Sequence, residues 1–315
     1  MSTQELTLFS YAKINWSLRV LGKRPDGYHE VRTLLQTVSL HDDLHFQSAG
    51  NNQIRLCCES PDVPADESNL VVKAARLLQR RHRPDSGATI RLEKRIPPKG
   101  GLGGGSSNAA MTLIALADLW NLNLSFVQLM ELGSELGADV PFFFVGGRAL
   151  ASGTGTQIIP APDCAKTNLI IVTPNASVST SEAYKALNSP ALTTGFEARI
   201  LANSFTEAKL DRSDQWPLHN DFEEVIFEIE PEIKRVQESL LDAGAQGVLL
   251  AGSGSSVFGI FKNADIQHRA LEVIQAEAGW RMFACDTLSR DEYLRSMGSG
   301  GSVLRSSITN FDSGA

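Results

Sequence analysis

A run of glycines dominates the middle of the first half of the chain. Five glycines occupy the six positions from Gly100 to Gly105, and two prolines and one lysine precede them. Such positions expose backbone N–H groups and let a ligand approach the chain closely. A strand pattern over residues 88–96 precedes the run, and a helical pattern over residues 106–120 follows it. Because the first N–H groups of a helix are unpaired and its dipole is positive there, the sequence predicts a phosphate-binding loop. The alternative is a flexible loop before a well-capped helix.

The run does not match two familiar nucleotide-binding loops. A Walker A loop ends in Gly-Lys-Ser/Thr, whereas the lysine here, Lys99, precedes the glycines. The dinucleotide fingerprint needs glycines at positions i, i+2 and i+5, and from Gly101 or Gly103 the third position is Ser106 or Asn108. Together with the early antiparallel β pattern, this count disfavours a dinucleotide oxidoreductase.

Two polar residues share one face of a predicted strand near the N-terminus. In Ala12-Lys13-Ile14-Asn15, alternation places Lys13 and Asn15 on one face and Ile14 on the other. A lysine inside a strand usually faces solvent, so a simple surface position is the alternative for Lys13.

A carboxylate follows the end of a predicted helix. Ser125 and Gln128 form a capping-box pattern that opens this helix, and Gly137 is expected to end it. Asp139 comes two residues later, ahead of the apolar run Phe142–Val145, which we expect to be a strand. A helix C-terminus disfavours anions, so Asp139 hints at a positively charged partner, with a turn-forming aspartate as the alternative.

A second glycine turn, Gly252-Ser253-Gly254, lies inside a strand–turn–strand pattern over residues 248–261. Such a turn alone is weak evidence of function, because many hairpins contain one. The other patterns predict strands at 6–22, 28–40, 44–48, 53–59, 168–173 and 280–288, a hairpin at 146–160, and helices at 69–82, 180–187, 222–243 and 265–278.

Composition narrows the class of protein. The length of 315 residues suits two domains, and the net charge of −7 argues against general binding of nucleic acids. The sequence has no apolar run long enough for a membrane helix, no leader pattern, and four cysteines without metal spacing. His41 and His45 lie in a polar turn, where we expect no metal site. We therefore expect a cytoplasmic protein with no nucleic-acid or membrane partner.

Taken in order, these pieces resemble the GHMP kinase superfamily, whose three sequence motifs correspond here to residues 12–15, 97–110 and 251–257. More narrowly, the strings at 24–29 (RPDGYH) and 136–141 (LGADVP) resemble the branch that phosphorylates a cytidine-diphosphate-linked polyol of the non-mevalonate isoprenoid pathway. The third motif departs mildly from the family, because Ser253 and Ser255 stand where many relatives have Thr and Ala.

The resemblance implies an α+β fold of two domains with the active site in the cleft between them. Residues 1–162 would form a ribosomal-protein-S5-domain-2-like β/α domain, and residues 163–292 a ferredoxin-like α/β domain. The Ser/Gly-rich residues 293–315 would be a loose tail.

The resemblance also implies roles for single residues. Asp139 would be the general base and Lys13 its partner, with Mg²⁺ accompanying ATP and no protein residue assigned as a metal ligand. The ATP phosphates would contact Pro98, Lys99, Gly100, Gly101, Leu102, Gly103, Gly104, Gly105, Ser106, Ser107 and Asn108. The acceptor would contact Asn15, Tyr28, His29, Thr180 and Tyr184. The third motif would contribute Gly252, Ser253 and Gly254.

Two alternatives remain beside this reading. A sister GHMP kinase would act on another alcohol, such as homoserine or a mevalonate derivative, and a non-catalytic binding protein would keep the fold without turnover. We expect a monomer or a weak homodimer.

Overall fold

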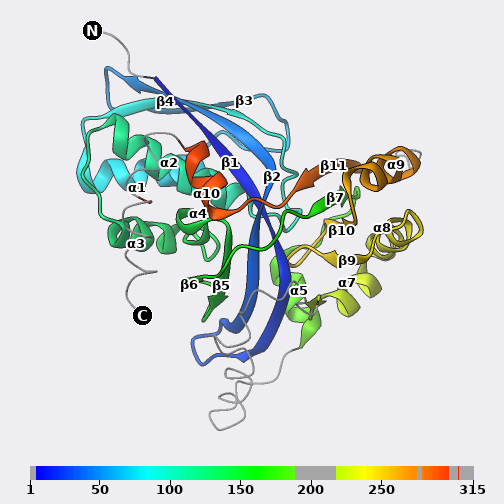
Figure 1. The fold of residues 1–315 in the computed structure, drawn as a ribbon. Coiled ribbons are helices and arrows are strands. Elements are labelled where there is room, and N and C mark those ends of the chain that lie inside the picture. Colours follow the sequence, from blue (N-terminus) through cyan, green and yellow to red (C-terminus); the bar gives the residue numbers. More distant parts are fainter. Residues whose placement is uncertain (1–4, 189–217, 275–278, 298–303, 305–315) are drawn as a thin grey trace.

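The computed structural model describes residues 5–188, 218–274, 279–297 and 304, and Figure 1 shows two sheets, each with its own helices. The first sheet has seven strands, in the order β3-β4-β2-β1-β8, with a β5–β6 hairpin attached to β2. Its strands are β1 (Glu5–Lys23), β2 (His29–Ala49), β3 (Ile54–Cys58), β4 (Gly87–Glu93), β5 (Arg148–Ser152), β6 (Gln157–Pro160) and β8 (His219–Asn220).

Strand β2 is continuous, whereas the sequence predicted two strands at 28–40 and 44–48. The polar stretch between them pairs with β1, where His41 lies opposite Tyr11 and Asp42 opposite Ser10. Asp42 is fully buried, and its carboxylate accepts hydrogen bonds from Lys94 Nζ at 2.6 Å and from the Ile96 N–H at 2.8 Å. These donors satisfy the buried charge, so the polar stretch can stay within the sheet, with a register shift beside it between Tyr11 and Ala12 of β1.

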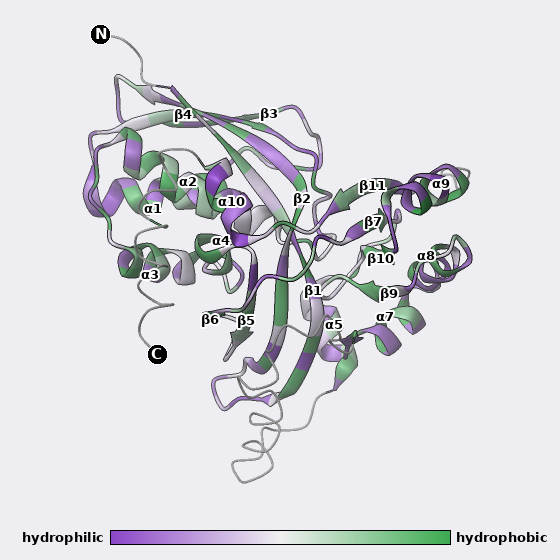
Figure 2. Ribbon diagram, viewed as in Figure 1, coloured by the Kyte–Doolittle hydropathy of each residue, from purple (hydrophilic) through white to green (hydrophobic). Residues whose placement is uncertain are grey.

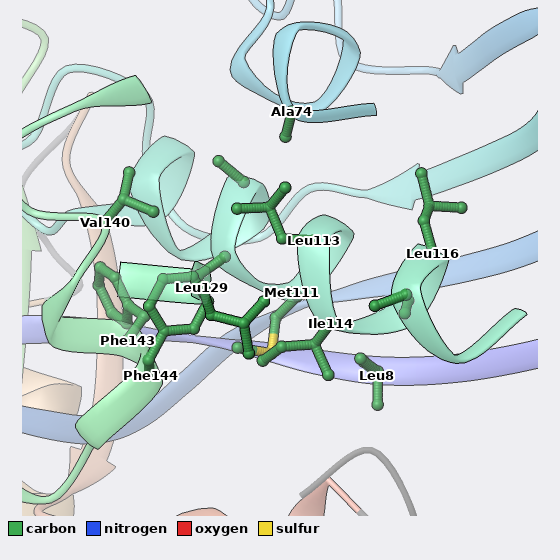
Figure 3. Packing of buried hydrophobic residues seen from close by; sticks show 14 of the residues in the cluster. Leu8, Ala74, Met111, Leu113, Ile114, Leu116, Leu129, Val140, Phe143 and Phe144 are labelled. Atoms are coloured by element: carbon green, nitrogen blue, oxygen red, sulfur yellow. The ribbon is translucent and has the colours of Figure 1, made fainter. Parts of the chain in front are cut away.

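Four helices pack on one face of this sheet (Figure 1): α1 (Leu70–His82), α2 (Gly104–Leu119), α3 (Phe126–Leu136) and α4 (Phe142–Val145). Helix α2 is apolar on nearly all sides and lies at the centre, as expected of a buried helix. Figure 3 shows its residues Met111 and Ile114 beside Leu129, with Leu8 of β1 nearby.

Residues Phe142–Val145 form a single helical turn, so the predicted strand was wrong. All four side chains are buried, and Pro141 at the N-cap has helical dihedral angles. A short apolar run fits a buried strand or a buried helix equally well, so periodicity alone could not separate the two. The hairpin predicted at 146–160 is present as β5 and β6.

The second sheet has four antiparallel strands in the order β11-β7-β10-β9. They are β7 (Asn168–Thr173), β9 (Gly247–Leu250), β10 (Val257–Phe261) and β11 (Arg281–Asp286). With helices between β7 and β9 and one between β10 and β11, the order along the chain is the βαββαβ of ferredoxin-like domains. The predicted ferredoxin-like class is therefore confirmed.

The helices of the second sheet are α5 (Thr180–Leu187), α7 (Glu223–Ile229), α8 (Pro231–Asp242) and α9 (Ala264–Ile274). Helix α8 buries Ile233, Val236 and Leu240 at intervals of three and four residues, and its ribbon alternates hydrophobic and hydrophilic colours in Figure 2. The poorly patterned sequence that ends near Pro217 lies outside the described residues, as does the end of the predicted helix at 275–278. No helix of the described ranges is long and apolar enough to cross a membrane.

A third core joins the two sheets. Ile14 and Trp16 of β1 pack with Leu169 and Ile171 of β7 and with Phe258 of β10. The alternation predicted for β1 is confirmed, because this face holds the sheets together while Lys13 and Asn15 point the other way.

The C-terminal segment returns to the first sheet, contrary to the loose tail expected from residue 293. Helix α10 (Arg290–Ser296) follows β11, and Tyr293 is fully buried with its hydroxyl donating to the Phe143 carbonyl. Met297 and Leu304 are buried in the same core. The serines and glycines in the sequence suggested a flexible tail, but the described apolar side chains of this segment pack into the core. Residues 298–303 and 305–315 of the expected tail lie outside the described residues.

Candidate active site

A cavity of about 840 Å³ lies where the two sheets meet. Strand β1, the glycine-rich loop, the α3–α4 turn, helix α5 and the second glycine turn all contribute to its walls. Of the residues proposed from the sequence, those that line it are Lys13, Asn15, Tyr28, His29, Gly101, Gly103, Ser106, Asp139, Thr180, Tyr184, Gly252 and Ser253.

Lys13 is held firmly in one wall. It is only 4% exposed, which excludes the solvent-facing alternative. Its Nζ donates to Asn15 Oδ1 at 2.9 Å, and Asn15 Nδ2 donates to Thr33 Oγ1 at 2.7 Å. The Thr33 hydroxyl donates in turn to the Ser17 carbonyl. This chain of hydrogen bonds fixes the direction of the lysine side chain.

Asp139 lies beside this lysine, in the turn between α3 and α4. Its Oδ2 is 3.7 Å from Lys13 Nζ, and its side chain is 43% exposed. At this distance the two charges attract each other, but the two atoms are too far apart for a hydrogen bond. The carboxylate therefore keeps lone pairs open toward the cavity, so a hydroxyl group of a ligand can bind there.

The glycine-rich loop approaches the pair through its backbone. Gly101 and Gly103 have φ angles of +74° and +69°, which favour glycine. A side chain at Gly103 would come within 2.9 Å of Lys13 Cγ, and one at Gly101 would collide with the Ala251 carbonyl oxygen. The Lys13 N–H donates to the Leu102 carbonyl at 2.9 Å, which ties the loop to β1.

Helix α2 begins at Gly104 without a side-chain cap, because its N-cap residue is Gly103. Its first N–H groups therefore remain available to an anion, as the sequence predicted. Ser106, in the first turn of the helix, lines the cavity.

Part of the predicted phosphate contact set is turned away from the cavity. Ser107 and Asn108 are buried: the Ser10 hydroxyl donates to Asn108 Oδ1 at 2.6 Å and lies 2.8 Å from the Ser107 hydroxyl, from which it can accept. These side chains anchor α2 to β1 instead of facing a ligand, because helical rotation points them inward. Pro98, Lys99, Gly100, Leu102, Gly104, Gly105 and Gly254 also lie outside the cavity lining.

The second glycine turn packs against the first. A side chain at Gly252 would lie 3.0 Å from the Gly101 carbonyl oxygen and 3.3 Å from Lys13 Nζ. The Ser256 N–H donates to the Gly100 carbonyl at 3.2 Å. The turn that looked weak in the sequence therefore belongs to the same site as the glycine-rich loop.

Aromatic rings line another part of the cavity wall, the aromatic end. His29 stacks on Tyr184 with ring centroids 4.4 Å apart and an angle of 20° between the planes, and Tyr184 meets Phe222 edge-on at 4.9 Å. Burial, and secondly the charge of Asp139, raise the pKa of Tyr184 to about 12. Burial, and secondly the charge of Lys23, lower the pKa of His29 below its usual value. Both rings are therefore neutral near pH 7.

Two other expected contacts lie near these rings. Tyr28 is 67% exposed at the rim. The Thr180 hydroxyl is 3.1 Å from the Ser253 hydroxyl, which connects α5 to the second glycine turn.

Charge in the cavity favours an anionic ligand. The described lining has three ammonium groups, Lys13, Lys23 and Lys185, against one carboxylate, Asp139. The sequence reasoning missed Lys23 and Lys185, and also Thr154 in the β5–β6 turn. Nothing in their local sequence distinguishes them from surface residues, so only the tertiary arrangement identifies them.

The described residues contain no group of three His, Cys, Asp or Glu side chains placed to hold a metal ion. Instead, His41 lies 3.4 Å from Asp43, and His45 Nδ1 is 2.9 Å from the Thr7 hydroxyl. A divalent ion that arrives with a nucleotide needs few protein ligands, because Mg²⁺ is usually held by phosphates, water and one or two carboxylates. The lining holds a carboxylate, Asp139, and a hydroxyl residue, Ser106, so it is compatible with an ion that the phosphates carry.

Known proteins resemble this chain over most of its length. Residues 69–147 match the GHMP kinases N terminal domain, and residues 203–279 match the GHMP kinases C terminal model. The 4-diphosphocytidyl-2-C-methyl-D-erythritol kinase of Syntrophus aciditrophicus (strain SB) is 41% identical over 278 residues, which cover 88% of this chain and 98% of that relative.

Solved structures agree with these matches. A crystal structure of 4-(cytidine 5'-diphospho)-2C-methyl-D-erythritol kinase superposes with a TM-score of 0.71 at 34% identity, covering 90% of this chain and 99% of the other. The homoserine kinase of Cytophaga hutchinsonii superposes with a TM-score of 0.67 at 18% identity, covering 92% and 97% of the two chains. The second likeness concerns the fold alone.

Proposed function

We propose a function from one premise: the chain belongs to the GHMP kinases, and within them to the 4-diphosphocytidyl-2-C-methyl-D-erythritol kinase family. The protein transfers the γ-phosphoryl group of ATP to the 2-hydroxyl group of 4-diphosphocytidyl-2-C-methyl-D-erythritol. This reaction is a step in the synthesis of isoprenoid precursors.

The observation that carries the proposal is the position of the Lys13–Asp139 pair. The pair lines one cavity together with the glycine-rich loop and the aromatic end: Lys13 lies beside Gly103, and the charge of Asp139 acts on Tyr184. In phosphoryl transfer the protein takes little part in covalent chemistry, and most of the acceleration comes from positioning and from stabilisation of charge. A base beside a phosphate-binding loop and an acceptor-binding end supplies the positioning.

In the proposed step, Asp139 accepts the proton of the acceptor hydroxyl group. The hydroxyl oxygen forms a bond to the γ-phosphorus, the bond from that phosphorus to the bridging oxygen breaks, and ADP leaves. Lys13 Nζ, 3.7 Å from the Asp139 carboxylate, attracts that carboxylate and stabilises the negative charge that develops on the attacking oxygen. The N–H groups at the start of α2 hold the phosphates, and bound Mg²⁺ would offset their charge.

The acceptor's cytidine ring would bind at the aromatic end. Tyr184 is a half-buried, neutral ring against which a base can stack, and the exposed Tyr28 would close over it from the rim. Lys23 and Lys185 face the cavity, so they would meet the negative diphosphate between the cytidine and the polyol. Neither homoserine nor mevalonate has a group that would use this end.

The direct test is a coupled assay of ADP release with a panel of alcohols. We expect turnover with the cytidine diphosphate ester and none with homoserine or mevalonate. Turnover with homoserine alone would identify a sister kinase, and no turnover with any alcohol would support a binding protein.

The role of the base is tested by Asp139→Asn. We expect this variant to fold and to bind ATP while turnover falls by about 10²–10⁴-fold, the usual contribution of a general base. Asp291→Asn is the matched control, because Asp291 is an exposed carboxylate with its own basic partner, Arg295, outside the cavity. An Asp139→Asn protein with the turnover of the control would remove the base assignment.

A further inference from the structure

A short segment of the second half of the chain is inserted beside β1. Strand β8 pairs in parallel with β1, so that His219 lies opposite Ser17 and Asn220 opposite Leu18. Asn220 is 4% exposed and is not among the residues that line the cavity. No sequence motif discussed above includes it.

The side-chain amide of Asn220 is fully used. Its Nδ2 donates to the Leu250 carbonyl at 2.8 Å and to the Gly252 carbonyl at 2.7 Å. Its Oδ1 accepts the Phe222 N–H at 3.0 Å. One buried side chain therefore holds both ends of the three-residue stretch from 250 to 252.

This stretch is the support on which the site is assembled. Gly101 of the phosphate-binding loop packs against the carbonyl of Ala251, and Gly252 lies next to Lys13 Nζ. A shift of the stretch would move both the loop and the surroundings of the lysine. Displacements of about 1 Å in a catalytic site can cost about 10²-fold in rate.

We infer that Asn220 is a positioning residue for phosphoryl transfer, because it fixes the stretch 250–252 that sets the phosphate-binding loop and Lys13 relative to each other. This inference rests on the proposed function. Asn220 touches no substrate, and it acts only through the turn that it holds.

A residue of helix α9, beside the second sheet, provides a close match. Gln267 of α9 is 8% exposed, and its Nε2 donates to the carbonyls of Leu169 at 2.7 Å and Cys285 at 3.0 Å. It therefore makes the same pair of hydrogen bonds with similar burial, but it holds β7 and β11 outside the cavity. If Asn220 only stabilised the fold, removing either amide would change stability, kcat and hydrogen exchange near the site in the same way.

The experiment compares Asn220→Ala with Gln267→Ala by thermal unfolding, steady-state kinetics and hydrogen exchange. We expect both variants to lose stability, because each leaves two buried carbonyls without their donors. With the cytidine diphosphate ester, kcat of Asn220→Ala is expected to be about tenfold to a hundredfold below that of Gln267→Ala. Peptides over 99–104 and 250–256 should exchange faster only in Asn220→Ala.

Equal kcat and equal exchange over these peptides in the two folded variants would overturn the inference. If Asn220→Ala does not fold, Asn220→Ser, which keeps a hydroxyl donor, is compared with Gln267→Ser by the same criteria. The proposed function and the role of Asn220 can be refuted independently of each other. Absence of turnover in the unmodified protein counts against the proposed function, whereas equal exchange in the two variants counts against the role of Asn220 whatever the substrate.

Discussion

The two ends of the cavity are built in different ways. At the phosphate end the binding surface is mainly backbone: glycines at positive φ and the uncapped start of α2. A buried lysine, held by a chain of hydrogen bonds, lies beside it. At the aromatic end side chains form the binding surface: the stacked pair His29–Tyr184 and the mostly exposed Tyr28. Backbone sites tolerate almost no change because each atom is shared with the fold, whereas a side chain at a rim can be replaced with a local effect.

The largest effect is expected from Gly101→Ala, at the phosphate end. The new methyl group would combine a positive φ with a collision against the Ala251 carbonyl, so the two glycine turns must separate. We expect kcat/KM to fall by at least about 10²-fold and the free energy of unfolding to fall by about 1–3 kcal/mol, the usual cost of overpacking.

Gly244→Ala is the control for this variant. Gly244 has a φ of +93° as well, but a side chain there would meet nothing closer than 4.0 Å. It should lose about 1–2 kcal/mol from the strained backbone alone and keep its turnover. Full activity in Gly101→Ala would show that the two turns can move apart freely, and the comparison between the two ends would fail.

An intermediate effect is expected at the aromatic end. Stacking of a base on an aromatic ring contributes about 1–3 kcal/mol. Tyr184→Ala should therefore raise KM for the cytidine substrate by about tenfold or more, and the more exposed Tyr28→Ala by less. KM for ATP should stay near normal in both variants.

Tyr184→Phe sharpens this test. The pKa of about 12 means that the phenol is un-ionised near pH 7, so the ring alone should suffice and the phenylalanine variant should resemble the unmodified protein. Equal losses of affinity for ATP and for the cytidine substrate in Tyr184→Ala would contradict the separation of the two ends.

The smallest effect is a pH dependence at the aromatic end. The pKa of His29 is lowered in the folded protein, first by burial and then by Lys23, so the unfolded chain binds a proton more readily than the folded one. His29 therefore leaves the stability of the fold unchanged above the ordinary histidine pKa of about 6.5, and lowers it as the pH falls below that value. Thermal unfolding from pH 7.5 to 5.5 should show a shallower loss of stability in His29→Asn than in the unmodified protein. Identical slopes would exclude this contribution.

The candidate site was partly predictable because several of its components are local. Alternation placed Lys13 and Asn15 on one face of a strand, the glycine count predicted the loop, and a carboxylate beyond a helix end suggested a cation nearby. The Lys13–Asp139 distance of 3.7 Å is consistent with that suggestion. Ser107 and Asn108 were harder to place, because their side chains turn toward Ser10 of a strand about a hundred residues earlier.

The sequence by itself therefore determines the phosphate loop, the polar face of β1 and most helix and strand positions. These features depend on φ preferences, periodicity and capping, which act within a few residues of the chain. Long-range packing decided the rest. It made Phe142–Val145 a helical turn, kept β2 unbroken around buried Asp42, brought α10 back to the first sheet and placed Asn220 beneath the second glycine turn. These features depend on which buried groups find partners from distant segments, and no local pattern in the chain specifies those partners.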